Sequence, residues 1–365
     1  MKLKNILSIL CVFFVAISCS MEDDILNEVG PTRPIEDEVS GEAYIAIKTL
    51  LSSGAETKSL QDKGELGATE AEAKITSCSL ILLNGNTVQS VADGVFVDKD
   101  NVIVKTASPD AAGDTVKFMV KVNQANYRLM VVANSNTTFT DCATLSDVEA
   151  KIQSDNVDDL VKVGINDVTF PDGFKGYAST VESSQHPVMT TVTLKQLTAR
   201  IELLGFNVSF INDTKPVNIV VTKVEVQNLN NNSRTGSEYL QDAAAEFTSS
   251  AKDYKANVFT AAEGVTTNSY TFGEEGNEDI QSFYSYRNNS TKSPLQMRIH
   301  YTADKVEKTT QWITINEGSP VQNGYIYRLI VNAKVTSDEF DCAIQFSTKP
   351  WVKHSMSVDM NEKTN

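Results

Sequence analysis

The side chains that most often carry catalysis or bind metals are few in this sequence and far apart. The histidines are His186, His300 and His354, and the cysteines beyond the first twenty residues are Cys78, Cys142 and Cys342. Neither set has the short spacing of a zinc site. The chain also lacks the G-x-S-x-G, P-loop, H-E-x-x-H and G-x-G-x-x-G patterns. We therefore expect no catalytic residue, no metal site and no cofactor.

Paired carboxylates offer a second route to catalysis, because two of them can act as general acid and base. The pairs Asp158-Asp159 and Glu274-Glu275 lie in polar stretches of the chain. Polar neighbours do not desolvate a carboxylate, so no raised pKa is expected at either pair. We predict that the protein is not an enzyme, and a surface glycosidase is the enzyme class that fits least badly.

Cys19 stands in a context that predicts lipid attachment. Lys2 and Lys4 form a short positive region, an uncharged apolar run spans Ile6–Ile17, and small residues then precede the cysteine. This order is typical of an export signal, and Ala-Ile-Ser-Cys resembles the lipobox of bacterial lipoproteins. We expect residues 1–18 to be the signal peptide and Cys19 to carry the lipid, palmitate included. The alternative is an ordinary secreted protein.

The residues after Cys19 have the composition of a solvated tether. Residues 19–41 are acidic, contain two prolines and show no apolar periodicity. Their first acidic group, Glu22-Asp23-Asp24, resembles the tag that sends some Bacteroides-type lipoproteins to the outer face of the outer membrane. We expect an outer membrane lipoprotein precursor.

Charge and length narrow the class of protein further. The 365 residues carry a formal charge of −15, which becomes −17 once the two lysines of the signal are removed. Nucleic-acid binding needs a basic surface, so we expect no nucleic-acid partner. Because about 100–200 residues per domain is usual, the mature chain has room for two domains. We expect these at residues 42–185 and 186–365.

Short apolar or alternating runs, separated by turn residues, dominate both halves of the chain. Such runs predict strands, here at Ile75–Leu83, Val102–Thr106, Thr115–Val122, Tyr127–Ala133, Thr191–Phe210, Val217–Gln227, Leu295–Tyr301, Thr310–Ile315 and Tyr325–Val335. Trp312 lies inside one of these runs, which favours a core position. Ser146 and Glu149 form a capping-box pattern at the start of a short helix. The sequence therefore predicts an all-β protein of antiparallel sandwiches with one or two short helices.

Two strand patterns stand apart, one near each end of the chain. Ala43–Ile47 is a short apolar run, and the polar stretch 52–73 after it is expected to be an exposed loop open to proteases. Near the C-terminus Met356, Val358 and Met360 alternate with polar residues. This pattern fits either an edge strand of its own domain or a strand given to another molecule.

Taken in order, several segments resemble those of the major fimbrial subunits, or fimbrillins, of Bacteroides-type bacteria. They are EAYIAIKTLLSSGAETK, EAKIT, LMVVANSNTTF, ATLSDVEAKI, VTLKQLTARIEL, NGYIYRLIVNAKV and TKPWVKHSMSVDM. The similarity spans nearly the whole chain, although each segment alone is a strand pattern.

The resemblance implies two transthyretin-like antiparallel β-sandwich domains in a subunit of a pilus shaft. In that family an arginine- or lysine-directed protease cuts the loop after the first strand, and the C-terminal strand of another subunit fills the groove. The strand that is lost would comprise Ala43, Tyr44, Ile45, Ala46 and Ile47, and the cut would follow Lys58 or Lys63. The donor-strand side chains would be Val352, Met356, Val358 and Met360.

The same resemblance sets the expected partners and location. Other copies of this chain, other fimbrial subunits, a processing protease and, through the lipid, the outer membrane would be partners. The mature protein would serve adhesion in a cell-surface fimbrium. Two alternatives stay open: an anchor or tip subunit of the same fimbria, and a surface lipoprotein that binds glycans through exposed aromatic side chains.

Overall fold

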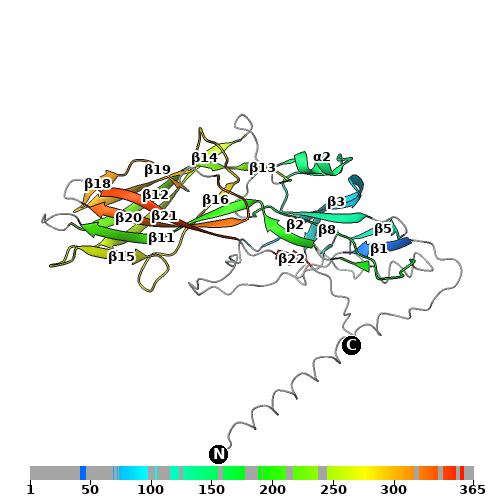
Figure 1. Ribbon diagram of the computed structural model, residues 1–365, viewed down its shortest axis with the longest axis horizontal. Helices are drawn as coiled ribbons and strands as arrows, with labels where there is room; N and C mark the ends of the chain where they lie inside the picture. Colours follow the sequence, from blue (N-terminus) through cyan, green and yellow to red (C-terminus); the bar gives the residue numbers. More distant parts are fainter. Residues whose placement is uncertain are drawn as a thin grey trace, which may run out of the picture.

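Strands account for nearly all the regular structure, as the apolar and alternating runs predict. The computed structural model describes residues 42–46, 69, 72, 74–97, 103–104, 116–122, 126–154, 159–176, 188–190, 192–210, 217–236, 245–315, 320–335, 340–350 and 354–356. Figure 1 shows an elongated molecule built of sheets with one labelled helix, α2. Most strand pairs are antiparallel, whereas β1 with β9 and β11 with β20 are parallel. The expected all-β class is confirmed.

A seven-stranded sheet organises the first half of the chain, with strand order β22-β10-β8-β6-β2-β3-β4. Its strands are β2 (Ser77–Asn84), β3 (Thr87–Val97), β4 (Ile103–Val104), β6 (Tyr127–Ala133), β8 (Lys162–Asp167), β10 (Val192–Gln196) and β22 (His354–Met356). The central strands β2 and β6 are mostly apolar and buried over nearly their whole length. Continuous apolar strands are expected where both faces of a sheet are covered.

A three-stranded sheet covers one of these faces. It consists of β5 (Lys117–Lys121), β1 (Glu42–Ala46) and β9 (Val188–Met189), with β1 in the middle. Phe118 and Val120 of β5 are buried and belong to one apolar cluster with Leu80, Leu82, Leu129 and Val131 of the larger sheet. The two sheets therefore form a sandwich around this cluster.

Helix α2 (Leu145–Ala150) lies on the opposite face of the seven-stranded sheet, above β2 and β3 in Figure 1. Its buried Val148 belongs to a second apolar cluster that contains Ile81 and Met130. The two clusters use alternate residues of the same strands, since successive side chains of a strand point to opposite faces.

The helix begins two residues earlier than the sequence pattern suggested. Thr144 is the N-cap, and its hydroxyl accepts a hydrogen bond from the Asp147 amide at 3.3 Å. Asp147 Oδ2 in turn accepts from the Thr144 amide at 2.8 Å. The expected capping box of Ser146 and Glu149 is therefore wrong, because a Thr and Asp pair makes the same reciprocal contacts at the preceding register.

The second half of the chain forms another two-layered structure. Its strands are β11 (Thr198–Phe210), β12 (Ile219–Asn230), β14 (Phe247–Phe259), β15 (Thr267–Thr271), β16 (Ser282–Tyr286), β17 (Gln296–Ala303), β18 (Val306–Thr309), β19 (Ile313–Thr314), β20 (Tyr325–Val335) and β21 (Phe340–Pro350). In one layer β12 pairs with β14 and β17. In the other, β11 pairs with β15, β16 and β20, and β20 pairs with β21. The layers join where β12 meets β16.

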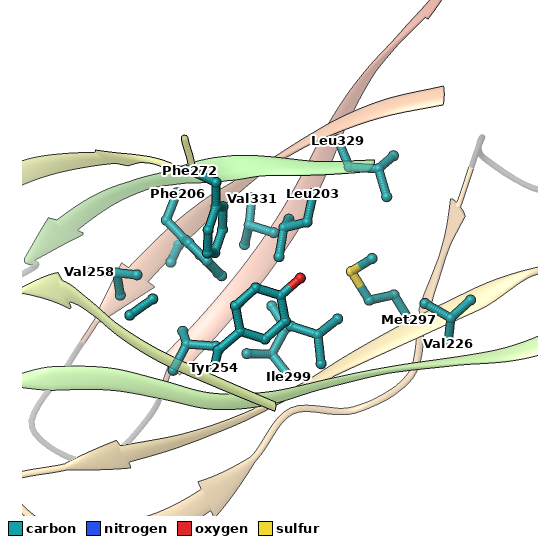
Figure 2. Packing of buried hydrophobic residues seen from close by; sticks show 14 of the residues in the cluster. Leu203, Phe206, Val226, Tyr254, Val258, Phe272, Met297, Ile299, Leu329 and Val331 are labelled. Carbon is teal, nitrogen blue, oxygen red and sulfur yellow. The ribbon is translucent and has the colours of Figure 1, made fainter. Parts of the chain in front are cut away.

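Figure 2 shows the side chains of these two layers meeting in the largest apolar cluster. Leu203 and Phe206 of β11 and Leu329 of β20 face Met297 and Ile299 of β17. Strand β17 alternates buried and partly exposed residues along its length. This period of two gave the sequence signal for the strand and fixes which of its side chains enter the core.

The two halves join almost directly. Strand β10 ends at Gln196 and β11 begins at Thr198, so Leu197 alone separates them. A two-stranded sheet adds a second connection, because β7 (Ile152–Ser154) pairs with β13 (Asn232–Arg234).

Strands β9 and β10 lie within the residues expected to form the second domain, 186–365. Yet β9 pairs with β1, and β10 pairs with β8, in the sheets of the first half. The hydrogen bonding therefore favours a domain boundary at Leu197 over one near residues 184–187.

Candidate functional site

Strand β1 occupies the centre of the three-stranded sheet. It pairs antiparallel with β5 from Glu42↔Lys121 to Ala46↔Lys117, and parallel with β9 at Ile45↔Val188 and Ala46↔Met189. Neighbouring strands lie about 4.7–4.9 Å apart. Without β1, therefore, β5 and β9 would face each other across a gap about 10 Å wide, which one strand fills.

The strand that flanks this position on β5 carries apolar side chains into the core. The register partners of Ala43 and Ile45 are Val120 and Phe118, which are 2% and 5% exposed. Val116, just before β5, is equally buried in the same cluster. The position of β1 therefore lies beside the sandwich core.

Strand β22 from the C-terminus lies close by in the topology. It pairs antiparallel with β10 at Val192↔Met356, Thr193↔Ser355 and Leu194↔His354. It stands at the end of the seven-stranded sheet, with β10 as its neighbour in the strand order. The segment that contains β9 and β10 thus contacts strands from both ends of the chain.

The predicted site residues fall partly within these strands. Ala43–Ala46 belong to β1, and Met356 is the last residue of β22. The remaining predicted residues lie outside the described part of the chain: Cys19, Ile47, Lys58, Lys63, Val352, Val358 and Met360. Their roles stay predictions.

The residues considered for acid-base or metal chemistry do not converge within the described residues. His300 Nε2 lies 3.2 Å from Glu225 Oε2, and its Nδ1 lies 3.1 Å from the Thr309 hydroxyl. His186 lies outside the described residues. In the described part of the chain no three His, Cys, Asp or Glu residues are placed to hold a metal ion. None of the helices described there is long and apolar enough to cross a membrane.

Two buried groups have pKa values well away from their ordinary range. Burial raises the pKa of the Cys78 thiol to about 12, against the opposing effect of the Lys162 charge. Burial lowers the pKa of Lys162 to about 8. A thiol held protonated is a poor nucleophile, and both Cys78 and Cys142 are free thiols. Cys78 therefore acts as a small core side chain.

Trp312 is not a core residue, contrary to the expectation from its alternating run. The Arg298 guanidinium lies 4.5 Å above the centre of its ring, and Arg298 also forms an ion pair with Glu225. Cation–π contacts of this kind stabilise aromatic rings near the surface. One face of the indole is thus covered by arginine, which argues against its use as a glycan platform.

One hollow lies where the layers of the second half diverge. Its volume is about 250 Å³, and it is lined by Leu229, Asn230, Asn231, Thr248, Ser250, Lys252, Ser282, Phe283 and Tyr284. Glycoside hydrolysis normally requires two carboxyl groups, and this lining contains none. The hollow therefore lacks the groups that a glycosidase would need.

Comparisons with known proteins point to surface proteins of related bacteria. No protein family matches the sequence, and no curated protein matches it. Three solved structures are similar to this chain. They are described as fimbrial or cell adhesion proteins, and none as an enzyme.

A candidate cell adhesion protein from Bacteroides eggerthii is 14% identical, with a TM-score of 0.49 over 87% of this chain and 98% of that one. A fimbrilin from Porphyromonas gingivalis is 15% identical, with a TM-score of 0.46 over 85% and 97%. The tip fimbrial protein Mfa3 from Porphyromonas gingivalis is 12% identical, with a TM-score of 0.40 over 85% and 100%.

The residues that fasten the start of β2 were missed by the sequence reasoning. Glu72 is 2% exposed and forms an ion pair with Arg200. A signal was present, because Thr69-Glu-Ala-Glu72 matches the S/T-x-x-E capping pattern. The partner at position 200 could not be found from local sequence.

Proposed function

We propose that this protein is a shaft subunit of a cell-surface fimbria, which polymerises by exchanging its first strand for the last strand of another copy. The observation that carries the proposal is the place of β1 in the middle of the three-stranded sheet. A middle strand cannot leave without exposing backbone hydrogen-bonding groups on both neighbours, so its loss creates a demand for a replacement strand.

The energetic side supports this exchange. Removing β1 uncovers the side of the sandwich that holds Phe118 and Val120. Covering an apolar side chain is worth about 1.5–3 kcal/mol. A donor with three or four apolar side chains would therefore contribute roughly 5–10 kcal/mol before the entropy of ordering it is counted.

The donor we propose is the C-terminal segment with Val352, Met356, Val358 and Met360. In its own chain the described part of this segment is held at three register pairs, all with β10. Few backbone contacts must therefore break for it to leave. Alternating apolar side chains would fix the register of the strand in a new groove.

Donor and groove lie at different places on the subunit, so the contact between copies is heterologous and repeats as a fibre. A protease cutting after Lys58 or Lys63 would free β1, and lipid on Cys19 would hold the precursor in the outer membrane until then. The partners are other copies of the chain, other fimbrial subunits and that protease.

A polymerisation assay tests the proposal. The chain from residue 20 onward is digested with a lysine-specific endoprotease and examined by electrophoresis in SDS without boiling, and by negative-stain microscopy. We expect a ladder of SDS-resistant polymers from the wild type and none after deletion of residues 352–365. Deletion of residues 361–365 alone is the matched control and should polymerise. Ladders from the longer deletion, or none from fully cut wild type, would refute strand exchange.

A further inference from the structure

The residues just before β2 form a short segment that is tied at both ends. At its start the Thr69 amide donates to Glu72 Oε2 at 2.7 Å, and the Glu72 amide donates to the Thr69 hydroxyl at 3.2 Å. At its end the Thr76 amide donates to Asn134 Oδ1 at 2.9 Å. We call residues 69–76 the strap.

The Glu72 side chain connects the strap to the second half of the molecule. Its carboxylate forms an ion pair with Arg200 of β11 and accepts a hydrogen bond from the Tyr284 hydroxyl of β16 at 2.6 Å. Its backbone carbonyl accepts from Gln196 Nε2 at 3.1 Å. One residue of the strap is thus bound by three separate strands, β10, β11 and β16.

Charges alternate through this contact. Arg200 Nε lies 2.9 Å from Glu202 Oε1, and Glu202 Oε2 lies 3.2 Å from Arg328 Nε. The four side chains in order are Glu72, Arg200, Glu202 and Arg328, with 2%, 6%, 9% and 12% of each exposed. The chain of charges is balanced, two against two. Removing one member would leave its buried partner uncompensated, which is strongly unfavourable.

Lys74 is the basic residue of the strap, and its two ends differ. The ammonium group lies 3.5 Å from Asp159, and the side chain is 55% exposed. The backbone carbonyl is held on the inside, where it accepts from Asn134 Nδ2 at 2.9 Å and from Lys162 Nζ at 3.0 Å. The next residue, Ile75, is 6% exposed. A protease could reach the lysine head, whereas the peptide bond after it is buried and hydrogen-bonded.

We propose that the strap is the fixed end of the processed subunit: it stays attached to both halves after β1 leaves, and it excludes the Lys74–Ile75 bond from processing. The geometry joins three features. Glu72 anchors the strap to the second half, Asn134 and Lys162 hold the Lys74 carbonyl, and Thr76 leads into β2. Cleavage at a folded site requires local opening of the chain, and here such opening breaks a buried ion pair as well as hydrogen bonds. The part about processing rests on the proposed function.

The test is limited proteolysis of the full chain with a lysine-specific endoprotease, with each new N-terminus identified by mass spectrometry. In the wild type we expect cleavage after Lys58 and Lys63 and none between Lys74 and Ile75. In Glu72→Gln, which has the shape but not the charge, cleavage after Lys74 should accelerate at least tenfold. Glu274→Gln is the control, because Glu274 is exposed, and it should behave as wild type.

Tyr284→Phe is a milder second variant, because it removes only the hydroxyl that donates to Glu72. It should raise cleavage after Lys74 less than Glu72→Gln does, and it keeps the test decisive if the charge variant fails to fold. Wild-type cleavage after Lys74 as fast as after Lys58 would overturn the proposal, as would unchanged protection in both variants. Protected Lys74 in a chain that is cut upstream but never polymerises would support the strap and count against strand exchange.

Discussion

Val188 and Val192 belong to one segment and pair with opposite ends of the chain. Val188 pairs with Ile45 of β1, and Val192 pairs with Met356 of β22. The strand that we propose is lost and the strand that we propose is donated therefore contact the same short segment. Any change in one of them takes place beside the other.

Replacing Ile45 by proline should weaken the place of β1. Ile45 pairs with both Phe118 and Val188, and proline has no amide hydrogen to donate and is not tolerated in the middle of a sheet. We expect the free energy of unfolding to fall by about 2 kcal/mol or more, measured by urea titration. Ile45→Val, which retains the amide, should cost under about 1.5 kcal/mol. Equal losses in both variants would contradict a central position for β1.

Replacing Gly205 by alanine should destabilise the second half of the chain. A Cβ atom at this position would lie 2.0 Å from the Tyr270 carbonyl oxygen, at a bulge where β11 shifts register against β20. Relief of such a clash requires backbone movement, so we expect a loss of about 1–3 kcal/mol. Thermal unfolding by circular dichroism measures it. Thr267→Ala on the neighbouring strand β15 is exposed and should change stability by less than about 0.5 kcal/mol.

Cys78 should resist alkylation in the folded protein. Its thiol is 2% exposed, and burial raises its pKa to about 12. The reactive thiolate is therefore almost absent at pH 8. Incubation with iodoacetamide followed by peptide mass spectrometry should find Cys78 unmodified in buffer and modified in urea. Rapid labelling in buffer would mean that the sandwich around β2 opens readily.

Acid should remove a part of the stability that depends on Glu225. Hydrogen bonds from Lys223, and then from Arg298 and His300, lower the pKa of this carboxyl to about 2. A carboxyl with a lowered folded-state pKa stabilises the protein above its unfolded value and loses that effect as pH falls. The loss should occur between about pH 4.5 and pH 2 and amount to about 1 kcal/mol, since the cluster lies near solvent. Glu225→Gln should flatten the stability curve in this window, and an unchanged acid slope would refute the assignment.

Sequence patterns located the strands whose side chains alone define them. The expected bounds Tyr127–Ala133 and Tyr325–Val335 are those of β6 and β20, because both strands have apolar runs long enough to mark their ends. Strand β14 (Phe247–Phe259) was missed, since its first half is polar and largely exposed. Its pairing with β12 defines it, and pairing between distant segments leaves little trace in local composition.

The candidate site was predictable only in part for the same reason. The apolar run Ala43–Ile47 marked a strand, and β1 covers its first four residues. Its neighbours, β5 and β9, lie far along the chain, so the central position was beyond sequence reasoning. The alternation at Met356 indicated a strand, while its register against Val192 came only from the fold.

The single-residue connection at Leu197 has a mechanical consequence. With β7 and β13 paired beside it and the strap across the same junction, bending one half against the other would break ladder hydrogen bonds and a buried ion pair. A pulling force would therefore pass through the subunit as through a stiff rod. In a fibre of such rods, bending and twisting would be confined to the contacts between neighbouring copies.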